Sequence, residues 1–256
     1  MADHVRITVW NEFRHERDPA HPEIGRLYPD GIHGTIAGAL TERLGDAVSV
    51  GTATLDEPRH GLSDETLAET DVLVWWGHMA HDQVDDEVAN AVVQRVLDGM
   101  GLVTLHSAMH SKPFVRLMGT SCNLRWRENN DRQALWVVSP SHPIVRGLPP
   151  VVLIPADEMY GEYFDIPPPE ELVFISAFTG GEVFRSGCCF RRGFGKIFYF
   201  SPGHETYPVY HQPEVQQILA NGVMWAYGTG QPAVERRTAP RSPAGWWGSL
   251  HEDEVG

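Results

Sequence analysis

The first half of the chain alternates between short apolar runs and longer stretches in which apolar residues recur at helical spacing. Four runs rich in β-branched and aromatic residues predict buried strands: Val5–Trp10, Val48–Thr54, Asp71–Trp76 and Gly101–His106. Amphipathic helices are predicted over Ile32–Leu44 and Val84–Leu97. Strands that alternate with helices favour an α/β fold with a mostly parallel, doubly wound sheet and right-handed crossovers.

The second half of the chain has a different pattern. After Gly119, short strand-like runs are separated by Gly and Pro: Leu135–Val138, Val151–Ile154, Leu172–Ala177, Glu182–Cys189 and Lys196–Ser201. These runs predict additional antiparallel strands, and a helix is expected over Pro213–Tyr227. A chain of 256 residues can bury one sizeable core, so we expect one domain over residues 1–228.

The C-terminal segment over residues 229–256 is rich in Pro, Arg and Gly and has no periodicity. This composition predicts a mobile or draped tail. Its Trp246–Trp247 pair has an alternative interpretation, as an anchor on a neighbouring surface or across an oligomer interface.

Charge and cysteine content narrow the class of protein. Twenty basic against 34 acidic residues give a net charge of −14, which repels phosphate backbones, so no nucleic-acid partner is expected. No apolar stretch of about 18 residues and no signal-peptide pattern occur, which predicts a cytoplasmic protein without a membrane partner. The cysteines Cys122, Cys188 and Cys189 form no even framework, and we expect free thiols in a reducing compartment.

Polar residues follow several predicted strands, where the ligand crevice of an open α/β sheet lies. The histidines at these positions are His78, His106 and His204, and His33 stands at the opening of the first helix. If His33, His106 and His204 converge, neutral imidazoles could hold one zinc-like divalent ion, with Glu158 or Glu205 as an orienting group or base. The spacing is not that of a metal motif such as HExxH. A lone histidine is more often structural, and this alternative stays open for His78 and His211.

Other polar segments have two interpretations each. Arg125 and Trp126 combine guanidinium and aromatic groups as sugar or carboxylate sites do, or form a surface turn. Asp157, Glu158 and Tyr160 directly follow a predicted strand, where acids act in proton transfer or cap a helix. Ser107 lies at a strand-turn-helix elbow without the glycines of G-x-S-x-G, which favours a helix cap over a nucleophile. His15 lies in a polar loop, and we expect it to be solvated.

Several sequence blocks together resemble the ThuA-like family, named for trehalose utilisation. They are, in order, VRITVWNEFRHE, YPDGIHGTIAGAL, DVLVWWGHMAHD, GLVTLHSAMHS, DEMYGEYFDIP and GKIFYFSPGHETYP. The resemblance covers residues 5–227 and implies a flavodoxin-like fold similar to class I glutamine amidotransferases. It implies functional roles for His33, His106, Glu158 and His204. The elbow of that larger fold carries a cysteine, but here it carries His106, which argues against glutamine hydrolysis because an imidazole does not replace a thiolate nucleophile.

The resemblance also implies disaccharide catabolism through keto-sugar intermediates. We therefore expect an enzyme that acts on a sugar or keto-disaccharide by isomerisation or cleavage, with no nucleotide cofactor and as a homo-oligomer. The expected catalytic residues are His106, His204, Glu158 and Glu205. The expected substrate-binding residues are Asn11, Glu12, Trp76, His78, Ser107, Arg125, Trp126, Tyr160 and His211. One alternative is a non-catalytic sugar-binding or regulatory module in which Trp75, Trp76 and Trp126 stack on sugar rings. Another, a glutamine amidotransferase-like subunit, needs a nucleophile that the chain lacks.

Overall fold

A single large sheet runs through the computed structural model, which describes residues 4–227. The tail predicted over residues 229–256, with Trp246–Trp247, lies outside the described residues. The strands of the sheet are β1 (Val5–Asn11), β2 (Val48–Thr54), β3 (Val72–Trp76), β4 (Gly101–Leu105), β5 (Arg125–Val137), β6 (Val151–Gly161), β7 (Glu171–Phe178), β8 (Val183–Arg192) and β9 (Gly195–Phe200). Their order across the sheet is β2-β1-β3-β4-β9-β8-β7-β5-β6.

The first five strands in this order pair in parallel. Their connections change direction beside β1, as in other doubly wound sheets. All residues of β3 and β4 are buried, because helices cover both faces of a parallel sheet and each strand then needs apolar side chains on both sides. The predicted parallel sheet of the first half is therefore confirmed, with strand ends within one residue of those expected.

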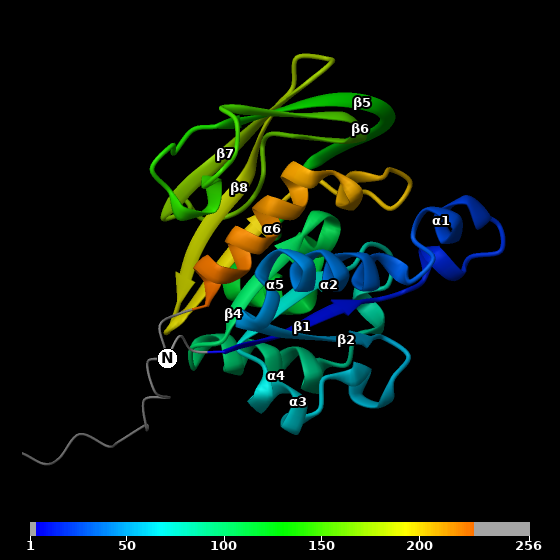
Figure 1. Cartoon of the computed structure of the whole chain (residues 1–256), viewed down its shortest axis with the longest axis vertical. Helices are drawn as coiled ribbons and strands as arrows, with labels where there is room; N and C mark the ends of the chain where they lie inside the picture. Colours follow the sequence, from blue (N-terminus) through cyan, green and yellow to red (C-terminus); the bar gives the residue numbers. More distant parts are fainter. Residues whose placement is uncertain (1–3, 228–256) are drawn as a thin grey trace, which may run out of the picture.

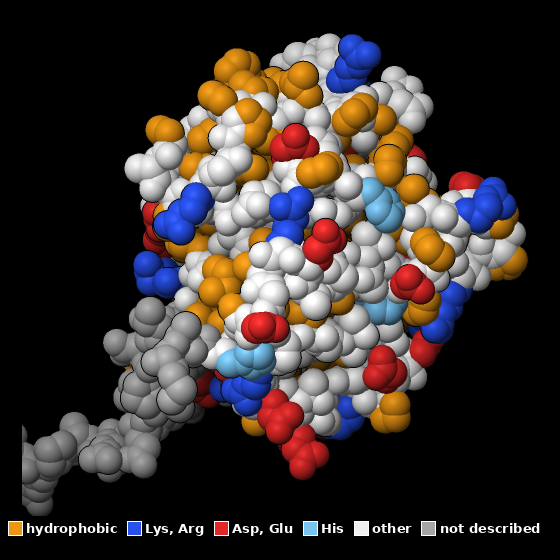
Figure 2. All heavy atoms as spheres, viewed as in Figure 1, with side chains coloured by type: hydrophobic (Ala, Val, Ile, Leu, Met, Phe, Trp, Pro, Cys, Tyr) orange, Lys and Arg blue, Asp and Glu red, His pale blue; other side chains and the backbone are white. Residues whose placement is uncertain are grey.

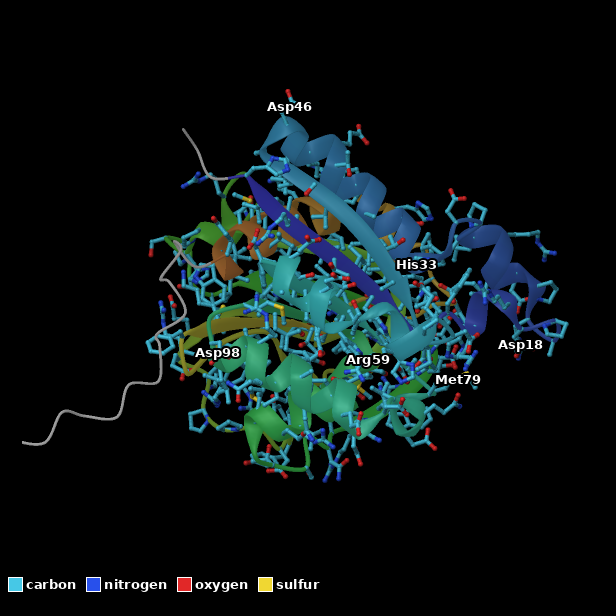
Figure 3. The ribbon with its side chains drawn as sticks, turned by 90° about the horizontal axis from the view of Figure 1, so that it is seen from below. Asp18, His33, Asp46, Arg59, Met79 and Asp98 are labelled. Atoms are coloured by element: carbon cyan, nitrogen blue, oxygen red, sulfur yellow. The ribbon has the colours of Figure 1, made fainter. Side chains whose placement is uncertain are left out.

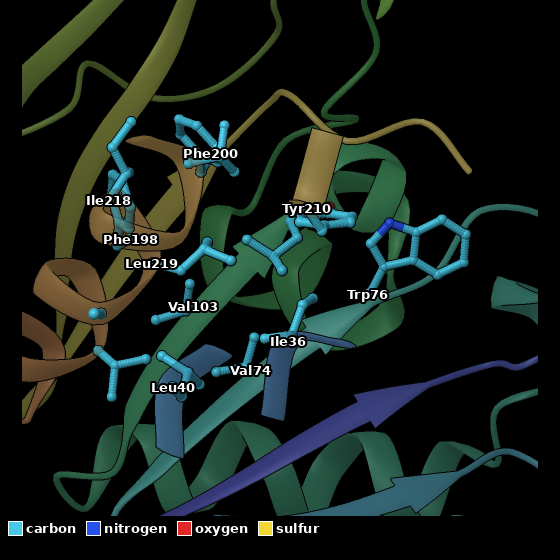
Figure 4. Packing of buried hydrophobic residues seen from close by; sticks show 14 of the residues in the cluster. Ile36, Leu40, Val74, Trp76, Val103, Phe198, Phe200, Tyr210, Ile218 and Leu219 are labelled. Carbon is cyan, nitrogen blue, oxygen red and sulfur yellow. The ribbon is translucent and has the colours of Figure 1, made fainter. Parts of the chain in front are cut away.

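Helices cover both faces of the parallel part (Figure 1). They are α1 (Pro22–Leu27), α2 (Gly31–Leu44), α3 (Asp64–Glu69), α4 (Asp86–Leu97), α5 (Lys112–Met118) and α6 (Pro213–Ala226). Figure 4 shows one face, where Ile36 of α2 and Leu219 of α6 pack near Val74 and Val103 of the sheet. Apolar residues of α3, α4 and α5 form a second core cluster with Trp75 and other residues of the sheet.

The remaining strands, β8, β7, β5 and β6, pair antiparallel, as predicted. The run Lys196–Ser201, also expected among the antiparallel strands, forms β9, which pairs antiparallel with β8 but parallel with β4. β8 continues beyond Cys189 to Arg192, and β5 and β6 are much longer than expected.

β5 begins at Arg125, ten residues before the predicted start at Leu135. Its first half is polar and exposed, so it lacks the apolar alternation by which a strand is recognised in a sequence. β6 continues to Gly161. Asp157, Glu158 and Tyr160 therefore lie inside a strand, and the alternative in which they cap a helix is wrong.

The three cysteines are free and buried, as predicted. Burial raises the pKa of Cys122 to about 11 and that of Cys188 to about 12. Because the thiolate is the reactive form, both side chains behave as small apolar groups. No described helix has both the length and the apolar character needed to cross a membrane.

Candidate functional site

Three histidines meet where neighbouring parallel strands end. His78 follows β3, His106 follows β4 and His204 follows β9, and their ring centroids lie 5.0 to 5.6 Å apart. Because β3, β4 and β9 are adjacent and parallel, their carboxyl ends share one rim of the sheet. Glu158 approaches from β6, and one ligand atom from each of these four side chains lies within 4.8 Å of the others. We call this group the histidine cluster.

His106 is fully buried and its backbone is left-handed, with φ of 52°, which is uncommon for a residue other than glycine. Its Nδ1 lies 2.8 Å from the carbonyl oxygen of Ser201. A carbonyl oxygen only accepts, so Nδ1 carries the hydrogen and donates it. The other nitrogen, Nε2, lies 3.1 Å from the Tyr160 hydroxyl and 3.2 Å from Oε2 of Glu158. In the neutral ring, Nε2 therefore presents a lone pair to a carboxylate.

The other two histidines are held through Nδ1 as well. In His78, Nδ1 lies 3.2 Å from Oε1 of Glu205, which can only accept when ionised. In His204, Nδ1 lies 2.7 Å from Oγ1 of Thr206. The backbone N–H of Thr206 also donates to this Nδ1, at 3.3 Å, which requires a lone pair there, so the contacts of His204 do not fix its tautomer. In the neutral rings of His78 and His106, Nε2 is the lone-pair nitrogen.

A buried group of facing acceptors needs a cation, either a proton or a metal ion. Oε2 of Glu158 is buried and has no hydrogen-bond partner among the described residues. Burial opposes charge on His106, but the contact with Glu158 and its charge outweigh burial, so the pKa of His106 is raised. Burial likewise opposes charge on Glu158, and the opposing influence of His106 lowers its pKa.

The donor set also fits a metal ion. Three imidazoles and a carboxylate match the ligands that zinc prefers, and ligating histidines nearly always donate their other ring N–H to a carboxylate, a carbonyl or a similar acceptor. The acceptors here are Glu205 for His78 and Ser201 for His106. These two rings can therefore bind a zinc-like ion without a change of tautomer, and His204 can supply the third imidazole.

His33 is not a member of this cluster within residues 4–227, although Figure 3 shows it at the same end of the molecule as Met79. Its Nδ1 lies 3.1 Å from Nδ2 of Asn11, which also donates to Oε1 of Glu16 at 2.7 Å. Glu16 in turn accepts the backbone N–H of Ile32 at 2.8 Å. His33 and Asn11 thus belong to a neighbouring network at the start of α2, and the expected convergence of His33 with His106 and His204 is corrected: His78 and Glu158 lie there instead.

A cavity of about 300 Å³ opens beside the cluster, at the small end of the range for small-molecule sites. Its lining includes His78, His204 and Glu158, together with Trp126, which is 66% exposed. Ser107 and Tyr160 also line it, with their hydroxyl oxygens 2.6 Å apart. The hydroxyl of Ser107 is thus hydrogen-bonded to Tyr160, and Ser111, not Ser107, caps helix α5.

Two carboxylates hold the loops that carry the histidines. Glu12 accepts the backbone N–H groups of Met79 and Ala80 at 2.8 and 2.9 Å, which fixes the loop after His78. Asp157 accepts the N–H groups of Gly203 and His204 at 3.0 and 3.1 Å, and burial raises its pKa to about 6. Asp157 was noted beside Glu158 but was not expected to support the site, because only the fold brings the loop after β9 against β6.

His15 is the histidine that sequence reasoning missed. Its side chain is only 15% exposed, so the expectation of a solvated residue is wrong. Its Nδ1 lies 3.1 Å from Oε1 of Glu205, and its ring stacks on His78 with centroids 5.1 Å apart. Glu205 thus lies between His15 and His78, and these histidines lower its pKa to about 2 although burial opposes the shift. The only signal in the sequence is the length of the polar segment that contains His15.

Besides Asn11 and Glu12, which hold His33 and the loop after His78, three more residues expected to bind substrate lie elsewhere. Trp76 is fully buried and its Nε1 donates to the carbonyl oxygen of Gly203 at 3.1 Å, so it offers no face to a sugar. His211 contacts the carbonyl oxygen of Leu27 and stacks on Tyr28. Arg125 lies at the exposed start of β5, and neither it nor His211 is among the residues that line the cavity.

One family model matches the chain, and solved structures resemble its fold. A family model described as trehalose utilisation (ThuA) matches residues 6–226. A ThuA-like protein of Parabacteroides merdae has a similar structure, with a TM-score of 0.63 and 15% identity over 88% of this chain and 90% of that one. For a ThuA-like protein of Bacteroides uniformis the values are 0.62 and 16%, over 90% and 94%. A cytoplasmic protein of Salmonella typhimurium has a TM-score of 0.57 and 13% identity, over 87% and 99%. These likenesses concern the fold alone, and no curated protein matches the chain.

Proposed function

The chain belongs to the trehalose utilisation (ThuA) family, and from this premise we propose that it is a cytoplasmic enzyme of sugar utilisation. Its substrate is a keto-sugar or a related disaccharide, which it isomerises or cleaves in the cavity beside the histidine cluster. One zinc-like divalent ion would assist, held by His78, His106 and His204, which leaves one position for a substrate oxygen and keeps Glu158 free as a base. The class I glutamine amidotransferase-like fold is part of the same proposal, but without glutaminase activity, because a histidine stands at the elbow.

One observation carries this proposal. Three histidines meet beside a cavity. In His78 and His106, Nδ1 donates to a fixed acceptor and Nε2 keeps its lone pair, and an unpaired carboxylate oxygen of Glu158 faces His106. A purely structural histidine has no need of this arrangement, because either tautomer satisfies an ordinary core position. Preorganised acceptors beside a cavity are typical of a site that holds a cation against a substrate oxygen.

The chemistry follows from what each group can do. When bound, a divalent ion would act as a Lewis acid that polarises the carbonyl group of a keto-sugar. The C–H bond beside that carbonyl is then acidic. Glu158 is ionised because its pKa is lowered, so it can accept this proton as general base. In an isomerisation the same carboxyl group returns the proton to the former carbonyl carbon, while the hydrogen of the neighbouring hydroxyl group moves to the former carbonyl oxygen. The hydroxyl of Tyr160 donates to Nε2 of His106, so toward a sugar hydroxyl it can act as an acceptor.

Elemental analysis combined with an activity assay tests the proposal. We expect a near-stoichiometric divalent metal in the untagged protein and turnover of a keto-disaccharide. His106→Ala should lose both, whereas His33→Ala, a histidine outside the cluster, should keep the metal. A wild-type protein without metal, or a His106→Ala variant with undiminished turnover, would contradict the assigned roles.

A second candidate function has one observation in its favour. Trp126 is exposed at the lining of the cavity, and an exposed aromatic face there suits the stacking of a sugar ring. A non-catalytic sugar-binding or regulatory module would use the same cavity. Calorimetry that shows tight disaccharide binding, with no product by mass spectrometry under any divalent metal, would favour this function over the enzyme.

A further inference from the structure

The antiparallel part of the sheet has apolar side chains on both of its faces. Leu135 of β5 and Val152 of β6 point to one face, which is buried in the core with residues of α6. Along each strand, the residues that alternate with these buried ones point to the opposite face and are wholly or partly exposed. An antiparallel sheet with one solvated face normally carries polar residues there, so the composition of this outer face is unexpected.

The register of the strands defines the outer face. Trp136 of β5 lies opposite Val151 of β6 and Ile175 of β7. In the next row, Ala134 lies opposite Leu153 and Ala177, and Ala177 lies opposite Val183 of β8. Directly paired residues of an antiparallel sheet project from the same face. We call this surface, made of Ala134, Trp136, Val151, Leu153, Ile175, Ala177 and Val183, the outer sheet patch.

The outer sheet patch has exposed apolar side chains and a cavity beside them. Trp136 is 50% exposed, Leu153 68% and Val183 53%. A cavity of about 700 Å³ lies beside them, lined by Trp136, Leu153, Pro155 and other residues of β5, β6 and β7. Figure 2 shows hydrophobic side chains gathered over the upper part of the molecule, where β5 to β8 lie in Figure 1. Contiguous apolar patches of this kind mark interaction sites in soluble proteins.

We propose that the outer sheet patch is the interface between two copies of this chain. The chain carries a net charge of −14, which opposes the association of two copies. The repulsion is weakest where the contacting faces lack acidic groups. On the outer face, β5 has no Asp or Glu from Arg132 to Trp136, and β6 has none from Val151 to Pro155. The outward positions of β7, Ile175 and Ala177, are also uncharged. The charged side chains there are Arg132, which also lines the cavity, and Arg185, which pairs with Glu162 at 2.9 Å.

The shape of the patch also suits a second copy. A two-fold interface requires a surface that is complementary to itself. Here a projecting Trp136 and Leu153 stand directly beside a hollow that the same residues line, so each copy can place its projecting side chains against the hollow of the other. Trp is also the residue type most enriched among side chains that dominate binding energy at interfaces. This proposal is independent of the proposed function, because the patch does not include the histidine cluster.

Sedimentation velocity of the full chain over a range of micromolar concentrations tests the proposal. We expect a reversible dimer. Trp136→Glu should weaken the dimer by about a hundredfold or more, since it places a charge in the centre of an apolar contact. Leu153→Glu is a second variant for the same face. Phe194→Glu is the matched control, because Phe194 is 52% exposed but lies in the turn between β8 and β9; this variant should stay dimeric.

Circular dichroism and metal content of each variant show whether it is folded with its site intact. Dimers in the wild type and Phe194→Glu, together with folded monomers of Trp136→Glu or Leu153→Glu, support the proposal. A wild-type chain that is monomeric at every concentration overturns it and assigns the patch to another occupant. A dimer that persists with unchanged affinity in both folded glutamate variants also overturns it, since the interface would then lie elsewhere.

Discussion

The histidine cluster depends on hydrogen bonds to atoms outside it. In a free histidine either ring nitrogen can carry the hydrogen, and each would be available as a ligand. Here a carbonyl oxygen and a carboxylate hold the Nδ1 atoms of His106 and His78 as donors, and Thr206 contacts Nδ1 of His204 through both its hydroxyl and its backbone N–H. The chemistry of the site is therefore set as much by Ser201, Thr206 and Glu205 as by the histidines.

Glu205→Gln tests this influence. The variant removes the charge that holds His78 and His15, and it offers an amide N–H that competes with the required orientation of His78. We expect metal affinity, measured by competition with a chelator, to fall by about 10- to 100-fold while the fold is retained. Glu171→Gln is the matched control, because Glu171 makes a similar contact with His142, at 3.3 Å, away from the cluster. Equal metal affinities in the two variants would count against a positioning role for Glu205.

Gly203 directly precedes His204 and has a backbone conformation that favours glycine. Its φ is 132°, a conformation that side chains rarely adopt, and an added Cβ would meet the hydroxyl of Tyr210. Gly203→Ala should therefore lower the free energy of unfolding by about 2 kcal/mol or more in urea titrations. Gly38→Ala is the control: no atom lies within 4 Å of the added Cβ, and Gly38 lies inside helix α2. This change should raise stability by about 0.5 to 1 kcal/mol.

At the scale of single elements, propensity and capping explain most boundaries. Ser63 begins α3 and accepts the backbone N–H of Thr66, and Ser111 caps α5 in the same way. Strand β5 follows a different logic. Its polar first half, from Arg125, is held by pairing with β6, where Trp126 lies opposite Tyr160. That pairing extends β6 far enough to bring Glu158 to the carboxyl ends of the parallel strands.

The cap of α3 can be tested alone. Ser63→Ala leaves the N–H of Thr66 without its acceptor at 3.1 Å, so we expect the free energy of unfolding to fall by about 1 kcal/mol. Ser63→Asp should restore most of the loss, because Asp is also a good N-cap residue and a negative charge is favourable at a helix N-terminus. If the alanine and aspartate variants are equally destabilised, the contribution of the cap is refuted.

At the scale of the whole molecule, burial of histidines couples stability to pH. Burial, with smaller contributions from His110 and His78, lowers the pKa of His81 from 6.5 to about 4. Between these pH values the unfolded chain binds a proton at this position and the folded chain does not. The contribution of the neutral, buried His81 to the free energy of unfolding is therefore fully present above pH 6.5 and is lost as the pH falls toward 4.

The effect can be measured by urea unfolding at pH 7.5 and pH 5. We expect His81 alone to account for a loss of about 2 kcal/mol at pH 5, so His81→Gln should lose correspondingly less stability than the wild type on acidification. His21→Gln serves as control, because the side chain of His21 is 61% exposed. An acid-induced loss of stability in His81→Gln equal to that of the wild type would show that His81 is not the group responsible.

The sequence by itself predicted the strands of the parallel part and the helices α2, α4 and α6, but not the short helices α1 and α3, nor the bounds of α5. Strands β3 and β4 were predicted because burial on both faces requires uninterrupted apolar residues, and β2, at the edge of the sheet, was predicted with its observed bounds. The position of His106 and His204 at one rim followed from the same pattern, since residues after parallel strands meet at one edge.

Only the tertiary structure decided the composition of the site. Local pattern carries no information on contacts between distant segments, and His15, Glu205 and His78 come from three of them. The place of His33 at the opening of the first helix suggested it as a ligand, but Asn11 holds it in another network. Glu158 reaches the cluster because the polar first half of β5 pairs with the end of β6. Hydrophobic periodicity does not reveal this polar segment as a strand. Polar residues that are satisfied only by remote partners have no periodic signature, so their roles become visible only once the chain is folded.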